Sequence, residues 1–267
     1  MRGMKEFRIA HIVPVSHLED TKDLQYHMCL AHLVGNEKYK NHFANMAKLG
    51  RFVLMDNGAA EGAQLQPEKL IEAYAEIRPR EIVLPDTLYE SGSTIQKTRN
   101  FINKLDNRNL FGEFRLMAVP QGSTFAEWLA CARIFVKDTR INTIGISKFL
   151  NICTKNRYIR YEACMALELL FAEYHRTDLE VHLLGCDEGP SVVKMIKNRF
   201  EFVRGCDSAF AYLQAQSGKM LTFEDDSRPE GTINFLNGKH YDEFVKYMEN
   251  FNEFAGAKEN GLSTTWL

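Results

Sequence analysis

Four polar side chains stand at the ends of short apolar runs in this chain, and their types suit covalent and acid–base chemistry. Three are the carboxylates of Asp56, Asp86 and Asp207, and the fourth is the amide of Gln121. A carboxylate can attack an acetal-like carbon, and a second acid or base must then handle the leaving group. A carboxylate and an amide together can read a purine-like edge that offers both donors and acceptors. The four residues indicate glycosidic-bond chemistry if the fold brings them together.

The chemical step is assigned to Asp207 and Asp56. Asp207 ends the last apolar run and is expected to be the nucleophile. Asp56 is its expected acid–base partner, with Glu188 as a weaker alternative. Small residues follow Asp56, among them Asn57 and Gly58, and they would let a ligand approach the backbone closely.

Substrate binding is assigned to Asp86, Gln121 and Gly122. The Asp86 carboxylate would accept hydrogen bonds from a substrate N–H pair, and Gly122 would free backbone N–H groups beside the Gln121 amide. A structural role stays open for each position. Asp56 can turn the chain, Asp86 can cap a helix or a turn, and Gln121 can open the first turn of a helix.

Strand-like and helix-like segments alternate along the chain. The predicted strands are residues 9–15, 28–34, 52–56, 82–86, 114–121, 143–147, 181–186 and 202–207. The predicted helices are residues 67–77, 91–105, 125–136, 158–174, 190–200 and 241–251. This alternation predicts a parallel sheet, and its length matches a (β/α)₈ TIM barrel, with a doubly wound open sheet as the alternative. Polar residues at the carboxyl ends of barrel strands would converge on one pocket.

The chain is expected to form one barrel domain over residues 1–255, followed by a C-terminal tail at 256–267. Residues 214–240 are polar and rich in turn formers. We expect them to be an insertion over the barrel mouth, between the last strand and the last helix.

The bulk composition is that of a soluble globular protein, with 45% hydrophobic and 25% charged residues. The chain has no apolar stretch of about 18 residues and no signal-peptide core, so we expect a cytoplasmic protein without a membrane partner. The six cysteines are dispersed without Cys-x-x-Cys spacing, and the histidines form no compact ligand pattern. No metal and no cofactor are therefore predicted.

A local basic patch would be needed for nucleic-acid binding, because the formal net charge is −2. Lys148, Lys155 and Arg157 follow the sixth predicted strand, and Lys219 follows the eighth. These residues belong to nearby units of the barrel and could form one phosphate-binding rim. Solvated helix faces are the alternative interpretation of such basic residues.

The ordered motifs resemble those of the tRNA-guanine transglycosylases, over roughly residues 8–222. The family's strand-three motif Asp-Ser-Gly-Gly-Phe-Gln reads Asp-Asn-Gly-Ala-Ala-Glu here, beginning at Asp56. The other similar positions are the strand-four Asp86, the Gln121-Gly122 pair, the strand-six Gly145, the Leu-Leu-Gly-Cys run ending at Cys186, Asp207, and Ser217-Gly218.

The resemblance implies a TIM barrel that exchanges a guanine base through a covalent intermediate. Asp207 would attack the anomeric carbon and expel guanine, and a free 7-deazaguanine base would then enter. Asp56 would act as general acid and base. Asp86 and Gln121 would hold the purine edge, assisted by backbone groups near Gly145. No energy cofactor is implied, because one N-glycosidic bond replaces another.

The chain departs from the family at its zinc site of three cysteines and a histidine, because no cysteine follows Cys206. It is therefore most similar to the short, zinc-free, phage-type enzymes that act on DNA, in the host cytoplasm if phage-encoded. A tRNA substrate is less favoured, and a homodimer or an accessory partner is possible. The same residues are also compatible with a barrel hydrolase of N-glycosidic bonds and with a non-catalytic barrel that binds nucleic acid.

Overall fold

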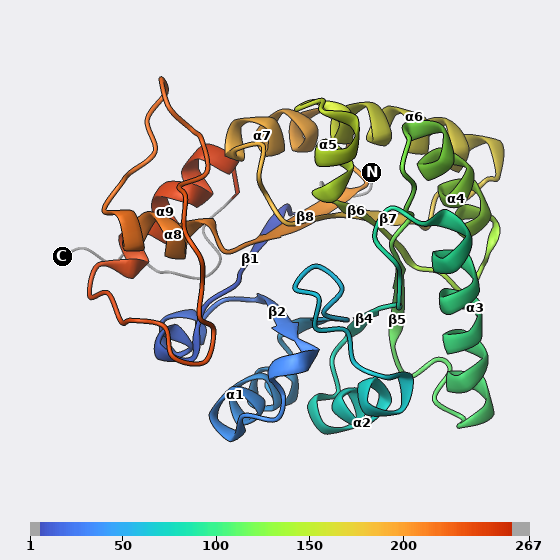
Figure 1. Cartoon of the computed structure of the whole chain (residues 1–267), viewed down its shortest axis with the longest axis horizontal. Helices are drawn as coiled ribbons and strands as arrows, with labels where there is room; N and C mark the ends of the chain where they lie inside the picture. Colours follow the sequence, from blue (N-terminus) through green and yellow to red (C-terminus); the bar gives the residue numbers. More distant parts are fainter. Residues whose placement is uncertain (1–5, 258–267) are drawn as a thin grey trace.

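The computed structural model describes residues 6–257, and its centre is a sheet of eight parallel strands that curls into a barrel (Figure 1). The strands are β1 (Arg8–His11), β2 (Tyr26–Leu30), β3 (Phe52–Asp56), β4 (Glu81–Val83), β5 (Arg115–Ala118), β6 (Thr143–Ser147), β7 (Glu180–Leu184) and β8 (Val203–Ser208). Their order is β1-β8-β7-β6-β5-β4-β3-β2. β1 and β2 are in contact but share no ladder within the described residues, so the barrel is nearly closed. The predicted (β/α)₈ barrel is confirmed.

Helices surround this barrel (Figure 1). They are α1 (Glu37–Lys48), α2 (Pro67–Ile77), α3 (Ser91–Asn107), α4 (Phe125–Lys137), α5 (Phe149–Thr154), α6 (Ile159–Glu173), α7 (Pro190–Arg199), α8 (Phe210–Ser217) and α9 (Phe244–Ala255). Helix α2 has the predicted bounds, because Pro67 suits a first helical turn and Arg78 ends the helix in the left-handed conformation. The sequence patterns predict no helix at α1, α5 or α8, since α1 is polar, α5 is short and α8 is almost entirely buried. Between residues 6 and 257, every helix is too short or too polar to traverse a lipid bilayer.

The first two predicted strands are too long. Each apolar run ends in a short 3₁₀ turn, Val15–His17 after β1 and Ala31–Leu33 after β2. Pro14 has no N–H for a strand ladder and precedes the first of these turns. The turn residues are largely buried although they are not extended. The apolar side chains of these segments therefore indicated correctly that the residues are buried, but not that their backbone is a turn.

The predicted insertion lies largely between α8 and α9. Its first residues belong to α8, and residues 218–243 have no long regular element. The segment packs beside the N-terminal turn after β1, where the Val15 N–H donates to the Phe235 carbonyl at 2.8 Å (Figure 1). Most of the predicted tail, residues 258–267, lies outside the described residues.

A buried ionic network fills the barrel near the amino-terminal ends of its strands. Glu81 is fully buried and accepts hydrogen bonds from Arg204, from the Thr143 hydroxyl at 2.6 Å and from Arg115 Nε at 3.3 Å. Glu180 pairs with the same two arginines. Burial alone would raise the pKa of Glu81, but the charge and hydrogen bonds of Arg204 outweigh it, and the pKa lies below its ordinary value. The network stabilises the end of the barrel opposite the predicted site.

Candidate active site

A cavity of about 220 Å³ opens at the carboxyl ends of the barrel strands. Asp56, Asp86 and Asp207 all line it. The last residues of six strands lie in its wall, namely Leu30, Asp56, Val83, Ser147, Leu184 and Ser208. The insertion contributes the outer wall through Gly231, Ile233 and Phe235, which confirms its predicted position over the barrel mouth. The structure therefore gathers three of the four predicted polar side chains in one pocket.

Asp207 lies near the end of β8 with both carboxylate oxygens engaged. Oδ2 accepts a hydrogen bond from the Gly185 N–H at 3.1 Å. Oδ1 lies 3.0 Å from His182 Nε2. The side chain is almost fully buried, so these contacts hold the carboxylate in one orientation at the cavity wall.

His182 on β7 links Asp207 to Tyr26 on β2. The Tyr26 hydroxyl lies 2.9 Å from His182 Nδ1. Burial lowers the pKa of His182, although the Asp207 carboxylate partly opposes that effect. A neutral imidazole carries one N–H, and only the Nε2–H tautomer satisfies both partners. His182 therefore donates to Asp207 and accepts from Tyr26, and the sequence offered no signal for this relay beyond a histidine inside a buried strand.

Asp56 ends β3 in a site that favours its protonated form. Its Oδ2 accepts a hydrogen bond from the Gly58 N–H at 2.8 Å. Burial raises the pKa of Asp56 well above its usual range, and the charges of Glu61 and Asp207 add to the effect. The backbone hydrogen bond opposes it only in part. A carboxyl group whose pKa is raised keeps its proton to higher pH and is better suited to general acid catalysis.

Asp86 lies at the centre of a polar cluster on the same wall. Its Oδ1 accepts from Asn57 Nδ2 at 2.8 Å, and its Oδ2 accepts from Gln121 Nε2 at 2.6 Å. Gln121 is buried behind Asp86 and does not line the cavity, whereas Asn57 does. A carboxylate has about four acceptor positions, so Asp86 can hold both amides and still accept two N–H groups from a ligand.

The three glycines predicted for substrate binding stand behind the cavity wall. A side chain at Gly145 would meet Leu184 at 2.8 Å inside the barrel. One at Gly122 would meet the backbone of α4 at 2.4 Å. Gly58 has a φ of +80° and orients its N–H toward Asp56. Each glycine permits close packing around the site, and direct contact with a ligand stays a prediction.

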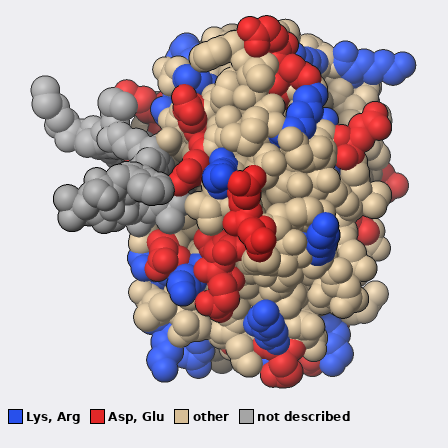
Figure 2. Space-filling view, turned by 90° about the vertical axis from the view of Figure 1, so that its left-hand side faces the viewer, with Lys and Arg blue, Asp and Glu red and all other residues tan. Residues whose placement is uncertain are grey.

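The predicted basic rim divides in the structure. Lys148 lines the cavity, whereas Lys155 and Arg157 border a separate surface depression. Arg157 donates to Asp226 at 3.0 Å, and Lys219 pairs with Asp225 on the exposed insertion. Figure 2 shows the face at the left of Figure 1, where acidic side chains lie among the basic ones and several group near the centre. That face is of mixed charge.

Glu188, the weaker predicted acid, has a structural role. It is buried, and its Oε1 accepts a hydrogen bond from Arg160 Nε at 2.7 Å. Arg160 is itself fully buried, so this pair holds the loop after β7 against α6. Glu188 does not line the cavity, whereas Glu61 and Arg228, which the sequence patterns did not single out, both do.

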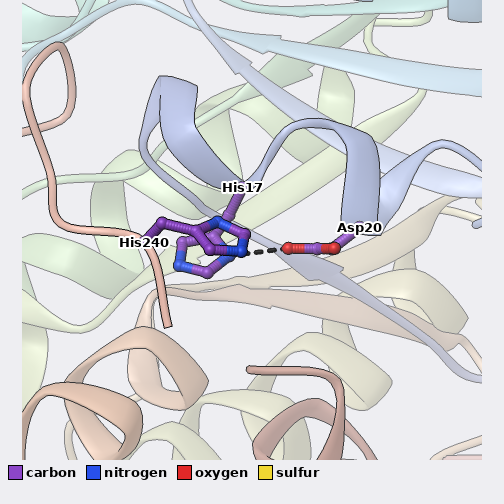
Figure 3. Close-up of side chains that lie close together, drawn as sticks. All are labelled: His17, Asp20 and His240. Carbon is purple, nitrogen blue, oxygen red and sulfur yellow. Dashed lines mark hydrogen bonds and ion pairs between the residues drawn. The ribbon is translucent and has the colours of Figure 1, made fainter. Parts of the chain in front are cut away.

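His17, Asp20 and His240 form the group of possible metal ligands found among residues 6–257 (Figure 3). His17 Nδ1 lies 2.6 Å from Asp20 Oδ2, and His17 Nε2 accepts the Tyr241 N–H at 3.0 Å. Both ring nitrogens of His17 are thus occupied, and no lone pair remains for a metal. The His240 ring stacks on His17 with centroids 4.5 Å apart. The group instead attaches the insertion to the turn after β1, through the contacts of His17 with His240 and with the Tyr241 N–H.

Buried neutral histidines should make the protein acid-sensitive. Burial lowers the pKa of His11, His27 and His42 to about 4, and it also lowers that of His17. These histidines bind protons near pH 6.5 when unfolded, so their contribution to stability is complete above that pH and is lost as the pH falls toward 4. For His11 the loss should reach about 3 kcal/mol. The raised pKa of Asp56 acts in the opposite direction.

Urea unfolding at a series of pH values measures this dependence. We expect the free energy of unfolding to fall between pH 6.5 and 4, and the fall to be shallower in His11→Gln, which lacks one titrating group. Equal slopes in the parent and this variant would contradict the assignment.

Comparisons with known proteins show the fold. No family model matches the sequence, and no curated protein matches it. The structure is similar to the crystal structure of an HpcH/HpaI aldolase from Desulfitobacterium hafniense DCB-2, with a TM-score of 0.52 and 10% sequence identity. The match covers 80% of this chain and 91% of that chain. Fold and site together define a TIM barrel with a carboxylate-lined cavity at the carboxyl ends of its strands.

Proposed function

We propose that this protein is an enzyme that exchanges guanine in DNA for a 7-deazaguanine base. The observation that carries the proposal is that Asp56 and Asp207, from strands on different sides of the barrel, line one cavity together with Asp86. Their types and environments fit a double displacement at an N-glycosidic carbon. The choice of DNA follows the similarity to the zinc-free, phage-type enzymes.

In the first displacement, the Asp207 carboxylate attacks the anomeric carbon of a guanosine nucleotide. The bond between that carbon and the purine nitrogen breaks, and its electron pair leaves with the base. Asp56 supplies the proton that neutralises the departing purine, a role that its raised pKa supports. The sugar is then esterified to Asp207, and the target base must have left the stack to reach the cavity.

In the second displacement, the incoming 7-deazaguanine base occupies the same purine position. Asp56, now ionised, accepts its proton while the purine nitrogen attacks the anomeric carbon. The ester bond to Asp207 breaks and regenerates the carboxylate. Two inversions retain the configuration of the sugar. Asp86 binds the N–H groups of either purine, with Gln121 and Asn57 holding its orientation.

The direct test is incorporation of a radiolabelled 7-deazaguanine base into DNA or tRNA that contains guanine. Incorporation of label into DNA supports the proposal. Incorporation into tRNA alone would show that the reaction is right but that the substrate is tRNA and not DNA. Release of free guanine without incorporation would instead indicate a hydrolase that uses the same carboxylates. Binding of DNA without either reaction would indicate a non-catalytic barrel.

His182 is proposed as a positioning residue for the nucleophile. The variant His182→Phe keeps an aromatic ring but loses both hydrogen bonds, so Asp207 loses its fixed orientation. We expect kcat to fall by about 10² with little change in KM for the DNA, because misplaced reacting groups cost rate more than binding. His182→Gln, which can still donate to Asp207, should recover part of kcat. Equal loss in both variants would contradict the positioning role.

A further inference from the structure

Two cationic side chains at the cavity mouth share a single carboxylate. Lys148 Nζ lies 3.4 Å from Asp187 Oδ2, and Arg228 Nε lies 3.2 Å from Asp187 Oδ1. All three side chains line the cavity and are about one-third exposed, at 27%, 32% and 30% for Lys148, Arg228 and Asp187. They are therefore accessible to a ligand that enters the cavity from solvent.

The three residues come from different elements that meet at this mouth. Lys148 follows β6, Asp187 lies in the loop between β7 and α7, and Arg228 belongs to the insertion between α8 and α9. The aliphatic stem of Lys148 crosses Gly185 so closely that a Cβ there would lie 2.6 Å from Lys148 Cδ. The N–H of this same glycine donates to Asp207. Gly185 thus lies against both the Lys148 side chain and the carboxylate of the proposed nucleophile.

The pairing leaves cationic donors in excess. A lysine and an arginine together present eight N–H donors, whereas one carboxylate accepts about four hydrogen bonds. Glu61 also lines the cavity and its charge interacts with that of Lys148, whereas Asp187 contacts both cations. Both contacts with Asp187 are longer than an ideal charge-assisted hydrogen bond of about 2.7–2.9 Å. A second anion can therefore join the group or replace Asp187.

Acidic side chains line the cavity beside these two cations, namely Asp56, Glu61, Asp86 and Asp207. An anionic group would be repelled by those of these side chains that are ionised and would remain near Lys148 and Arg228, while an uncharged purine and sugar could pass inward. The charge arrangement thus separates the anionic part of a substrate from its reacting part.

We propose that Lys148 and Arg228 form a clamp for a backbone phosphate of the DNA substrate, and that Asp187 holds the two cations in place until the phosphate binds. The inference rests on the proposed function, because it concerns a phosphate next to the guanosine that Asp207 attacks. The proposed phosphate site lies at the cavity mouth and does not include Lys155, Arg157 or Lys219.

Fluorescence anisotropy with two labelled oligodeoxynucleotides tests the clamp. Both contain a single guanine, and in one the two linkages flanking it are uncharged methylphosphonates. For the parent protein at low salt, we expect the neutral linkages to weaken binding about tenfold, because a charge-assisted contact with phosphate is lost. Lys148→Met and Arg228→Met should bind the two oligonucleotides with nearly equal affinity. Asp187→Asn should bind the charged oligonucleotide more tightly than the parent does.

Two matched variants control for general effects of charge. Lys246 pairs with Glu243, and Arg199 pairs with Glu168, both away from the cavity. Lys246→Met and Arg199→Met should discriminate between the oligonucleotides as the parent does. The clamp is overturned if the parent binds both equally or neither measurably, or if Lys148→Met and Arg228→Met still discriminate as the parent does.

The binding assay contains no incoming base and measures no turnover, so its outcome is separate from that of the proposed reaction. A parent that discriminates between the linkages but exchanges no base retains the clamp and loses the reaction. A parent that exchanges base but ignores the linkage charge retains the reaction and loses the clamp.

Discussion

Asp207→Asn should abolish base exchange, with a loss of roughly 10⁴-fold or more in rate. The amide keeps the size of the carboxylate and can still accept a hydrogen bond from His182, but it is too weak a nucleophile to form the glycosyl ester. Incorporation of labelled base measures the rate. Without an incoming base, the parent protein should also form a covalent adduct with DNA that survives a denaturing gel, and the variant should form none.

Asp242→Asn is the control for this prediction, because its side chain is 99% exposed and lies outside the cavity. It should retain the parent rate and the adduct. If Asp207→Asn incorporated label as fast as Asp242→Asn, Asp207 would not be the nucleophile.

Arg204→Met should destabilise the fold by about 3–5 kcal/mol, because it leaves Glu81 fully buried without its main partner. The exposed pair of Arg199 and Glu168 offers a matched control, and Arg199→Met should cost less than about 1 kcal/mol. Urea unfolding of the two variants gives both values.

A double variant separates the buried charge from the packing around it. Glu81→Leu combined with Arg204→Met removes both charges, so it should be less destabilised than Arg204→Met alone. If Arg204→Met cost no more than Arg199→Met, the network would not hold the barrel in the way described.

Much of the barrel was predictable from local patterns, and the errors have physical causes. Apolar runs located all eight strands, since a parallel strand buried on both faces is rich in apolar side chains. The same runs overestimated the first two strands, because buried 3₁₀ turns need apolar side chains as well. Helix α1 was missed because it is polar overall, although its buried Tyr39, Phe43 and Met46 recur at helical spacing and Asn36 caps it by accepting the Tyr39 N–H.

The sequence predicted those site residues whose location in the pocket depends only on their position along a strand. Asp56, Asp86 and Asp207 lie at or near the carboxyl ends of parallel strands, so closure of the sheet brings them to one mouth. Gln121 was predicted to reach the pocket, but it lies behind Asp86. Its amide donates a hydrogen bond to Asp86 and does not line the cavity. The basic rim was predicted only from the positions of its residues after particular strands. Those positions do not reveal that Arg157 and Lys219 form ion pairs with carboxylates of the insertion.

The sequence by itself determined the alternation of strands and helices and the carboxylates at or near the ends of three of the strands, because these properties depend on residues close together in the chain. Only the tertiary structure decided that His182 orients Asp207, that Asp187 joins Lys148 to Arg228, and that His17 meets His240. Such contacts depend on which strand tips and loops meet when the barrel closes. Hydrogen bonds and charges act over a few ångströms of space, whatever the separation of their residues along the chain.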